Sequence, residues 1–149
     1  MGDADNYLKA VEHYQQAIAL ACNEFEMEID AANVYVKLGM TKTLSHASPE
    51  AIRAAYQEAI RRAPWHTYAY ILMGEQSEGE QAIAYYSKAI ELDPDYAVPY
   101  VKRGLIYTQQ GKTQKAAADF ERAKERALDS KWRDTAEVQL RLLREEKTP

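Results

Sequence analysis

The chain contains three histidines and one cysteine, the residue types that most readily act as bases, nucleophiles or metal ligands. His13, His46 and His66 lie far apart, and none has a second ligand at the i, i+4 spacing that places two metal ligands on one helix face. Cys22 is flanked by alanine and asparagine, with no basic residue beside it to favour the thiolate. We therefore expect surface or interface histidines and an inert thiol.

Carboxylates are frequent in the stretch 24–30, where Glu24, Glu26, Glu28 and Asp30 alternate with other residues. On a helix with about 3.6 residues per turn, side chains two positions apart point in different directions. This spacing spreads the carboxylates around the helix and does not make a metal cage. The chain also has no glycine-rich loop of the kind that binds phosphates. The sequence predicts no catalytic residues, no cofactor and no metal site.

Charge and cysteine content restrict the partners and the compartment. The formal net charge is −4, and no clustered Lys/Arg face stands out, so we expect no nucleic-acid partner. A single cysteine excludes an internal disulfide and fits a reducing compartment. The first residues, MGDADN, lack the apolar core of a secretory signal, and no apolar run approaches ~18 residues. These features predict a cytoplasmic protein that does not insert into a membrane.

Helix formers dominate the chain, which has only six glycines and five prolines. Four segments place a small or aliphatic residue, an aromatic residue and an alanine at i, i+4 and i+7, which is one face of a helix. Alanine lets another helix approach that face, and the aromatic ring fills the remaining gap. The segments are internal repeats. Their residues are Ala10, Tyr14 and Ala17; Ile52, Tyr56 and Ala59; Ala82, Tyr86 and Ala89; Ala116, Phe120 and Ala123.

Partner helices are predicted between these segments, at 31–44, 66–80 and 97–112. Each contains one glycine inside the helical pattern, and such a glycine costs about 1 kcal/mol relative to alanine, which indicates close backbone packing. These glycines are Gly39, Gly74 and Gly104. Ser48 followed by Pro49 predicts a helix start, and Gly111 predicts a helix end.

This arrangement resembles the tetratricopeptide repeat, a helix-turn-helix unit of about 34 residues. The last repeat carries the resemblance best, through Tyr100, Gly104, Tyr107, Gly111, Ala116, Phe120 and Ala123. The resemblance implies an all-α fold, a right-handed superhelical stack of helix-turn-helix repeats within one domain, 1–149. We place a repeat helix at 5–22, repeats at 24–64, 65–94 and 95–128, and a capping helix at 129–147. Equivalent positions 10, 52, 82 and 116 are 42, 30 and 34 residues apart, so the repeats are expected to be irregular.

In the family that the chain resembles, the first helix of each pair lines a concave groove that binds partners. The matching positions here form the predicted contact set, which is mostly apolar with an acidic edge. It comprises Asn33, Val36, Met40 and Thr43; Tyr68, Ile71, Glu75 and Glu78; and Val98, Val101, Lys102, Leu105 and Thr108. Such a surface suits an amphipathic helix or an apolar peptide segment of a partner protein. The resemblance therefore implies a non-catalytic scaffold or adaptor, and a chaperone for a client segment is a variant of this hypothesis.

Some members of that family clamp the C-terminal carboxylate of heat-shock chaperones with lysine, asparagine and arginine side chains. The matching positions here hold Val36, Met40, Leu72, Val98 and Lys102, only one of which is a cation. A carboxylate at these positions would lose water and gain almost no charge-assisted hydrogen bonds. We therefore predict no such clamp.

A second hypothesis stays open. Val36, Val98, Val101 and Leu105 could be core contacts, covered by the last helix of the chain or by a second copy. The protein would then be a structural or self-associating module, a possible homo-oligomer whose groove is already filled.

Overall fold

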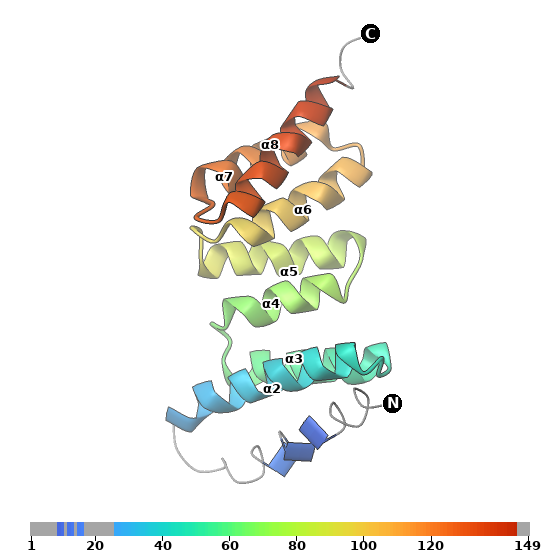
Figure 1. The fold of residues 1–149 in the computed structure, drawn as a ribbon, viewed down its shortest axis with the longest axis vertical. Coiled ribbons are helices and arrows are strands. Elements are labelled where there is room, and N and C mark those ends of the chain that lie inside the picture. Colours follow the sequence, from blue (N-terminus) through green and yellow to red (C-terminus); the bar gives the residue numbers. More distant parts are fainter. Residues whose placement is uncertain (1–8, 11, 14, 17–25, 146–149) are drawn as a thin grey trace. The chain divides into compact units, whose positions relative to one another are not determined.

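The computed structural model describes residues 9–10, 12–13, 15–16 and 26–145, with side chains from Ala31 onward in the longer range (Figure 1). Two compact units are present, residues 1–76 and 77–149. The regular structure in the described residues is helical throughout, which confirms the all-α fold class. The helices are α2 (Glu26–Leu44), α3 (Pro49–Arg62) and α4 (Thr67–Glu75) in the first unit, and α5 (Gly79–Leu92), α6 (Ala97–Gln109), α7 (Thr113–Arg126) and α8 (Ser130–Glu145) in the second. Most of the helix predicted at 5–22 lies outside the described residues.

In the first unit, α2 and α3 pack closely because a glycine faces an aromatic ring. Gly39 of α2 lies against Tyr56 of α3, where an added Cβ would come within 2.6 Å of the ring atom Cδ1. Tyr56 is only 1% exposed. The start of α3 is also as predicted, since Pro49 is its first residue and the Ser48 hydroxyl accepts a hydrogen bond from the Ala51 N–H (3.3 Å).

The same turn contact occurs once in each unit. In the first unit, the Tyr70 hydroxyl donates to the carbonyl of Pro64 (3.1 Å), six residues earlier in the chain. In the second unit, the Tyr100 hydroxyl donates to the carbonyl of Pro94, also over 3.1 Å. Each pair joins a proline turn to the first helix after it. This recurrence shows that the repeats predicted from the sequence have a common local structure at these turns.

The second unit has a core built from α6, α7 and α8. Alanines from each helix allow close approach, and Phe120 fills the space between them with no exposed surface. Gly104 of α6 lies against the Phe120 ring, where an added Cβ would come within 2.8 Å of Cε1. The buried members are Ala97, Tyr100, Val101, Ala116, Phe120, Ala123, Ala127, Ala136, Leu140 and Leu143.

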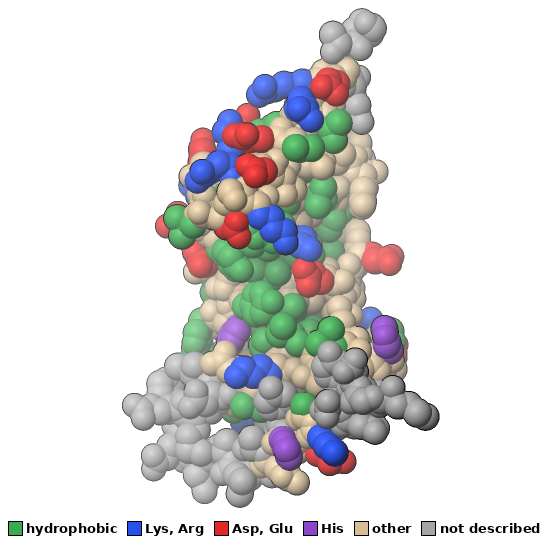
Figure 2. Space-filling view, in the orientation of Figure 1, with side chains coloured by type: hydrophobic (Ala, Val, Ile, Leu, Met, Phe, Trp, Pro, Cys, Tyr) green, Lys and Arg blue, Asp and Glu red, His purple; other side chains and the backbone are tan. Residues whose placement is uncertain are grey.

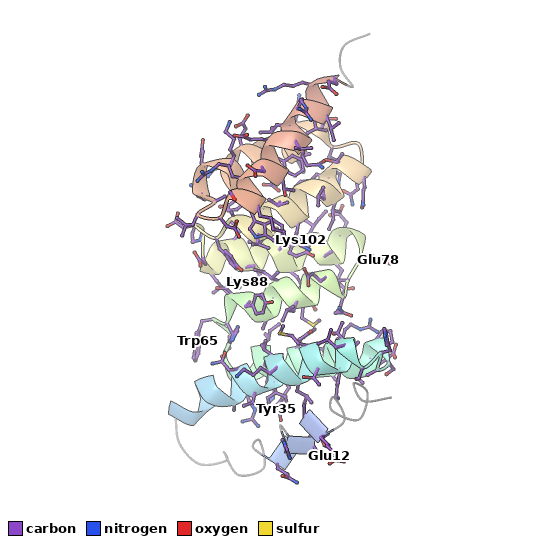
Figure 3. All side chains as sticks on the ribbon, in the orientation of Figure 1. Glu12, Tyr35, Trp65, Glu78, Lys88 and Lys102 are labelled. Atoms are coloured by element: carbon purple, nitrogen blue, oxygen red, sulfur yellow. The ribbon has the colours of Figure 1, made fainter. Side chains whose placement is uncertain are left out.

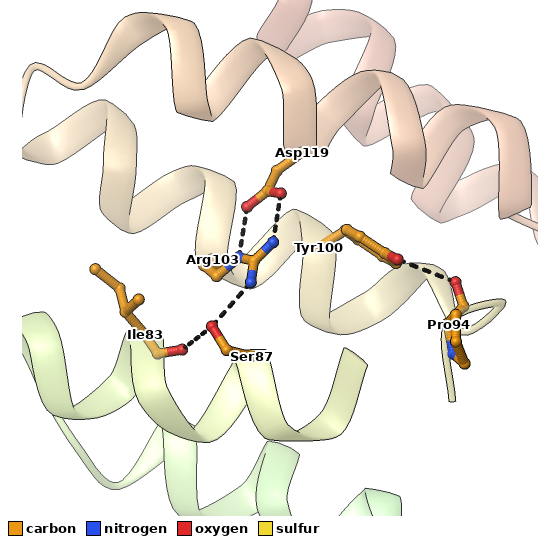
Figure 4. A network of polar contacts seen from close by, with 6 residues as sticks. All are labelled: Ile83, Ser87, Pro94, Tyr100, Arg103 and Asp119. Atoms are coloured by element: carbon orange, nitrogen blue, oxygen red, sulfur yellow. Dashed lines mark hydrogen bonds and ion pairs between the residues drawn. The ribbon is translucent and has the colours of Figure 1, made fainter. Parts of the chain in front are cut away.

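A polar network crosses α5, α6 and α7 beside this core (Figure 4). Arg103 donates from Nε and Nη2 to the two carboxylate oxygens of Asp119, over 2.8 and 2.7 Å. Its Nη1 donates to the Ser87 hydroxyl (2.8 Å), which in turn donates to the carbonyl of Ile83 (2.7 Å). Each polar side chain in this chain of contacts has a partner, so the network joins three helices without leaving a buried polar group unpaired.

In the part of the chain that the structure describes, no helix combines the length and the apolar character needed to cross a membrane. The division into repeats at 24–64, 65–94 and 95–128, with a cap at 129–147, stays a prediction.

Candidate functional site

The contact set predicted on α2 and α4 divides into buried and exposed residues in the first unit. Val36 is 5% exposed and Ile71 is 1% exposed, so both belong to the interior of the protein. Met40 and Tyr68, in contrast, are 39% and 38% exposed. Glu75, at the end of α4, is exposed as well. Hydrophobic side chains are visible over α4 in the space-filling view (Figure 2). On these two helices a partner could therefore reach Met40, Tyr68 and Glu75, but not Val36 or Ile71.

Asn33 is tied to the start of α4 through a histidine. His66 is the N-cap of α4, and its Nδ1 accepts a hydrogen bond from the Ala69 N–H (3.2 Å). The neutral ring then carries its proton on Nε2, which lies 3.0 Å from Oδ1 of Asn33 and can donate to it. The interface role expected for His66 is thus a cap that links α2 to α4.

The hydroxyl of Tyr56 lies beside a predicted contact residue of α2, 3.4 Å from the hydroxyl of Thr43. Burial raises the pKa of Tyr56, the hydrogen bond to Thr43 lowers it, and the nearby groups of Glu75 and Tyr68 raise it further. The hydrogen bond links the exposed Thr43 to the buried ring of α3.

In the second unit the predicted contact residues lie along α6, and most are covered. Val98 is 8% exposed and Val101 has no exposed surface. Val101 shares its core with Leu140 and Leu143 of α8, and Leu105 packs against the same cluster. Lys102 and Thr108 are half-buried, and the Thr108 hydroxyl donates to the Gly104 carbonyl (3.1 Å). α8 thus contributes to the environment that buries the α6 positions.

Val98 lines a small cavity at the start of α6. The cavity has a volume of about 270 Å³ and lies between the α5–α6 turn and the α7–α8 connection. Its other walls include Tyr96, Arg126, Leu128 and Trp132. The prediction from α6 alone could not include the last two, because they belong to a segment about 30 residues further along the chain.

Several exposed apolar residues lie outside the predicted contact set, among them Trp65 and Leu128. Trp65 is 50% exposed and lies at the connection between α3 and α4 (Figure 3). Leu128, at the α7–α8 connection, is fully exposed. The signal for Trp65 was available, since a tryptophan directly follows the turn residue Pro64.

The candidate chemical residues are dispersed. His13 and His46 are exposed, and Cys22 and Glu24 lie outside the described residues. Among the residues that the structure describes, no group of three His, Cys, Asp or Glu side chains is arranged to hold a metal ion.

Curated relatives match parts of this chain. A UDP-N-acetylglucosamine--peptide N-acetylglucosaminyltransferase from Giardia intestinalis is 32% identical over 68 residues, which are 46% of this chain and 4% of the relative. A peroxisomal targeting signal receptor from Pichia angusta is 27% identical over 139 residues, 91% of this chain and 23% of the receptor. The chain therefore spans less than a quarter of the length of either relative.

Family models and a solved structure agree with the repeat geometry. Residues 68–111 match the model described as TPR repeat, and residues 97–130 match the model described as Tetratricopeptide repeat. The structure of the Arabidopsis OM64 TPR domain is 22% identical, covers 79% of this chain and 98% of that domain, and superposes with a TM-score of 0.68. That likeness shows the fold. Residues 68–130 of this chain therefore consist of tetratricopeptide repeats.

Proposed function

We propose that this chain is a non-catalytic interaction module that holds an apolar segment or an amphipathic helix of a partner protein. The observation that carries the proposal is the exposure of Met40 and Tyr68, two large side chains at predicted contact positions of α2 and α4. Their helical neighbours Val36 and Ile71 are buried and contribute to the interior. Met40 and Tyr68 are therefore additional apolar side chains that the interior does not cover.

The chemistry of the exposed residues suits a protein partner. Methionine adapts its shape to irregular apolar surfaces, and tyrosine offers a large ring with a polar tip. Glu75 supplies an acidic edge at the end of α4 and favours a segment with a basic residue beside its apolar face. In the second unit, α6 has contact residues of its own that are half-buried, namely Lys102, Leu105 and Thr108.

A binding experiment with paired variants tests this proposal. The double variant Met40→Glu/Tyr68→Glu places two carboxylates where an apolar segment would dock, so we expect partner capture to be lost while helicity is retained. Ala84→Glu/Ala118→Glu is the matched control, because it adds the same charge at two exposed positions outside the predicted contact set. Capture is measured quantitatively from lysate and repeated with the purified partner. Equal binding by the double variant and the wild type would show that α2 and α4 are not the contact surface.

A second candidate function is a structural module in which α8 already fills the α6 positions. The packing of Leu105 against the cluster that contains Leu140 and Leu143 favours it. Leu105→Ala separates the two functions. Because Leu105 packs against the core, the change should lower stability in either case. Only an adaptor would also lose affinity for its partner under conditions in which the variant remains folded.

A further inference from the structure

The outer face of α8 is apolar at its middle and charged toward its ends. Ala136, Leu140 and Leu143 are buried on one side of the helix. On the opposite side, Val138 and Leu142 are 43% and 44% exposed. Both lie on the most exposed line of α8, because helical residues at i and i+4 share one face.

Charged residues extend this line in both directions and alternate in sign. Lys131 and Asp134 precede Val138, and Arg141 and Glu145 follow it. Lys131 and Glu145 are each seven residues from Val138, while Asp134 and Arg141 are four and three residues from it. Opposite charges therefore stand at nearly equal distances on either side of Val138. Basic and acidic side chains are interspersed in this part of the second unit in the space-filling view (Figure 2).

We propose that this face of α8 pairs with the same face of a second copy of the chain, antiparallel, about a twofold axis at Val138. In that arrangement Val138 meets the partner's Val138, and Asp134 lies opposite the partner's Arg141. Thr135 and the partner's Leu142 face each other on the other flank. Lys131 lies within reach of the partner's Glu145 at the two ends. Twofold symmetry repeats each of these contacts.

The pattern also selects the direction of pairing. In a parallel pair about a twofold axis along the helices, each flank faces the partner's opposite flank, so Asp134 would lie opposite the partner's Thr135 and Arg141 opposite the partner's Leu142. Both charges would then lack a partner of opposite sign. The antiparallel pair gives each of them such a partner, and charged contacts of this kind specify orientation in paired helices.

Arg141 already makes an ion pair within one copy, and this pair would have to be exchanged on pairing. Arg141 lies 3.9 Å from Glu145 in the same helix, with 69% and 65% of the two side chains exposed. An ion pair as exposed as this contributes little, so exchanging it for contacts with a second copy costs little. Arg144, whose Nη2 is 3.5 Å from Glu121 of α7, lies off the line and is not used.

The size of the face indicates a weak association. α8 has 16 residues, and a helix of this length extends only about 24 Å. One pair of such helices buries less than the ~1,200 Å² of a standard interface. We therefore expect a dimer that forms at high concentration and dissociates on dilution. This surface is separate from the contact residues of the proposed function, so either inference can fail without the other.

Charge exchange tests the pairing. The mass of the full chain is measured by sedimentation equilibrium from low micromolar to near-millimolar concentration, and we expect it to rise toward that of a dimer. Arg141→Glu should weaken association by about tenfold or more, because two attractions become repulsions. Asp134→Arg should do the same. The double variant Asp134→Arg/Arg141→Glu restores opposite charges and should restore association. Arg122→Glu, on the exposed surface of α7, is the matched control and should have no effect.

Cross-linking tests the orientation in a Cys22→Ala background, which removes the single cysteine. Val138→Cys should oxidise readily to a covalent dimer. Chains with Lys131→Cys should cross-link to chains with Glu145→Cys in a mixture, and each should cross-link poorly to itself. A mass that stays monomeric at every concentration would overturn the proposal. Association that is unchanged in Arg141→Glu would also overturn it, because the interface would then lie elsewhere. Efficient cross-linking of Lys131→Cys chains to one another would overturn it as well, because it would show a parallel pair.

Discussion

Arg103 of α6 and Asp119 of α7 are joined by two parallel hydrogen bonds of 2.8 and 2.7 Å. Both side chains are largely buried, with 17% and 8% of their surface exposed. The hydrogen bonds to Asp119 raise the pKa of Arg103 above its already high value, so the guanidinium stays charged. The pair is therefore a fixed electrostatic link between the two helices of one repeat.

Removing one partner of this ion pair should lower the stability of the fold. Asp119→Ala leaves a buried guanidinium without its carboxylate, and we expect the free energy of unfolding to fall by about 2–4 kcal/mol, less than for a fully buried pair because some exposure remains. Chemical denaturation of the full chain measures this. The double variant Arg103→Leu/Asp119→Leu should be less destabilised than Asp119→Ala, since no unpaired charge is left.

An exposed ion pair of the second unit provides the control for that prediction. Lys112 Nζ lies 2.9 Å from Glu80 Oε1, with 40% and 72% of the side chains exposed. Glu80→Gln should leave the free energy of unfolding nearly unchanged, because water screens an ion pair as exposed as this. A loss with Asp119→Ala as small as this would mean that the Arg103 network does not hold the helices together.

Gly104 should not tolerate even one methyl group. Gly104→Ala gains up to about 1 kcal/mol of helix propensity. However, the new Cβ would lie 2.8 Å from Cε1 of Phe120, and such overpacking typically costs about 1–3 kcal/mol. We expect a net loss of stability in thermal or chemical denaturation. Combining it with Phe120→Leu should cost less than the sum of the two single changes, and additive effects would show that the two residues do not clash.

At the ends of α2 and α6, introducing and removing a glycine should change stability in opposite directions. His46, after α2, has φ of 54°, and Gly111, after α6, has φ of 68°. In both turns a backbone N–H returns to the helix, from Ala47 to the Lys42 carbonyl (2.9 Å) and from Lys112 to the Tyr107 carbonyl (2.8 Å). Glycine suits this left-handed conformation and other residues do not. His46→Gly should stabilise the chain and Gly111→Ala should destabilise it, each by up to about 1 kcal/mol. Denaturation midpoints check this, and changes of the same sign would contradict it.

Burial of Tyr56 predicts a loss of stability at alkaline pH. Its pKa is raised in the folded chain, chiefly by burial, whereas the unfolded chain releases the same proton near pH ~10. Above that pH the unfolded state binds fewer protons, so the free energy of unfolding falls as the pH rises. Tyr56→Phe should reduce this fall. Tyr35→Phe, on the half-buried Tyr35 of α2, is the control and should leave the alkaline slope closer to that of the wild type. Equal slopes for both variants would contradict the role of Tyr56.

Local features of the fold could be predicted because they depend on neighbours in the sequence. Ser48 and Pro49 define the start of α3 with their own backbone and side-chain atoms. Ala116, Phe120 and Ala123 share one helix face because of the helical period alone. Their recurrence at similar intervals was enough to predict an all-α repeat fold.

The candidate site could be predicted only as a set of positions. Periodicity placed Met40 and Leu105 at matching places, one residue after Gly39 and Gly104, yet Met40 is 39% exposed and Leu105 is half-buried. Leu105 packs against a core to which α8 contributes Leu140 and Leu143, about 35 residues further along the chain.

The sequence by itself determined that this chain is a series of helices with internal repeats, that α3 begins at Pro49, and that the helices pack closely at their glycines. It did not determine every helix boundary, since the segment predicted as one helix at 66–80 contains the end of α4 and the start of α5. The properties that it determined follow from backbone preferences and from the helical period, which act over a few residues. Only the tertiary structure decided which contact positions remain open, that His66 caps α4 beside Asn33, and that Arg103 pairs with Asp119. Burial and ion pairing depend on which distant helix covers a given face, and no local pattern contains that information.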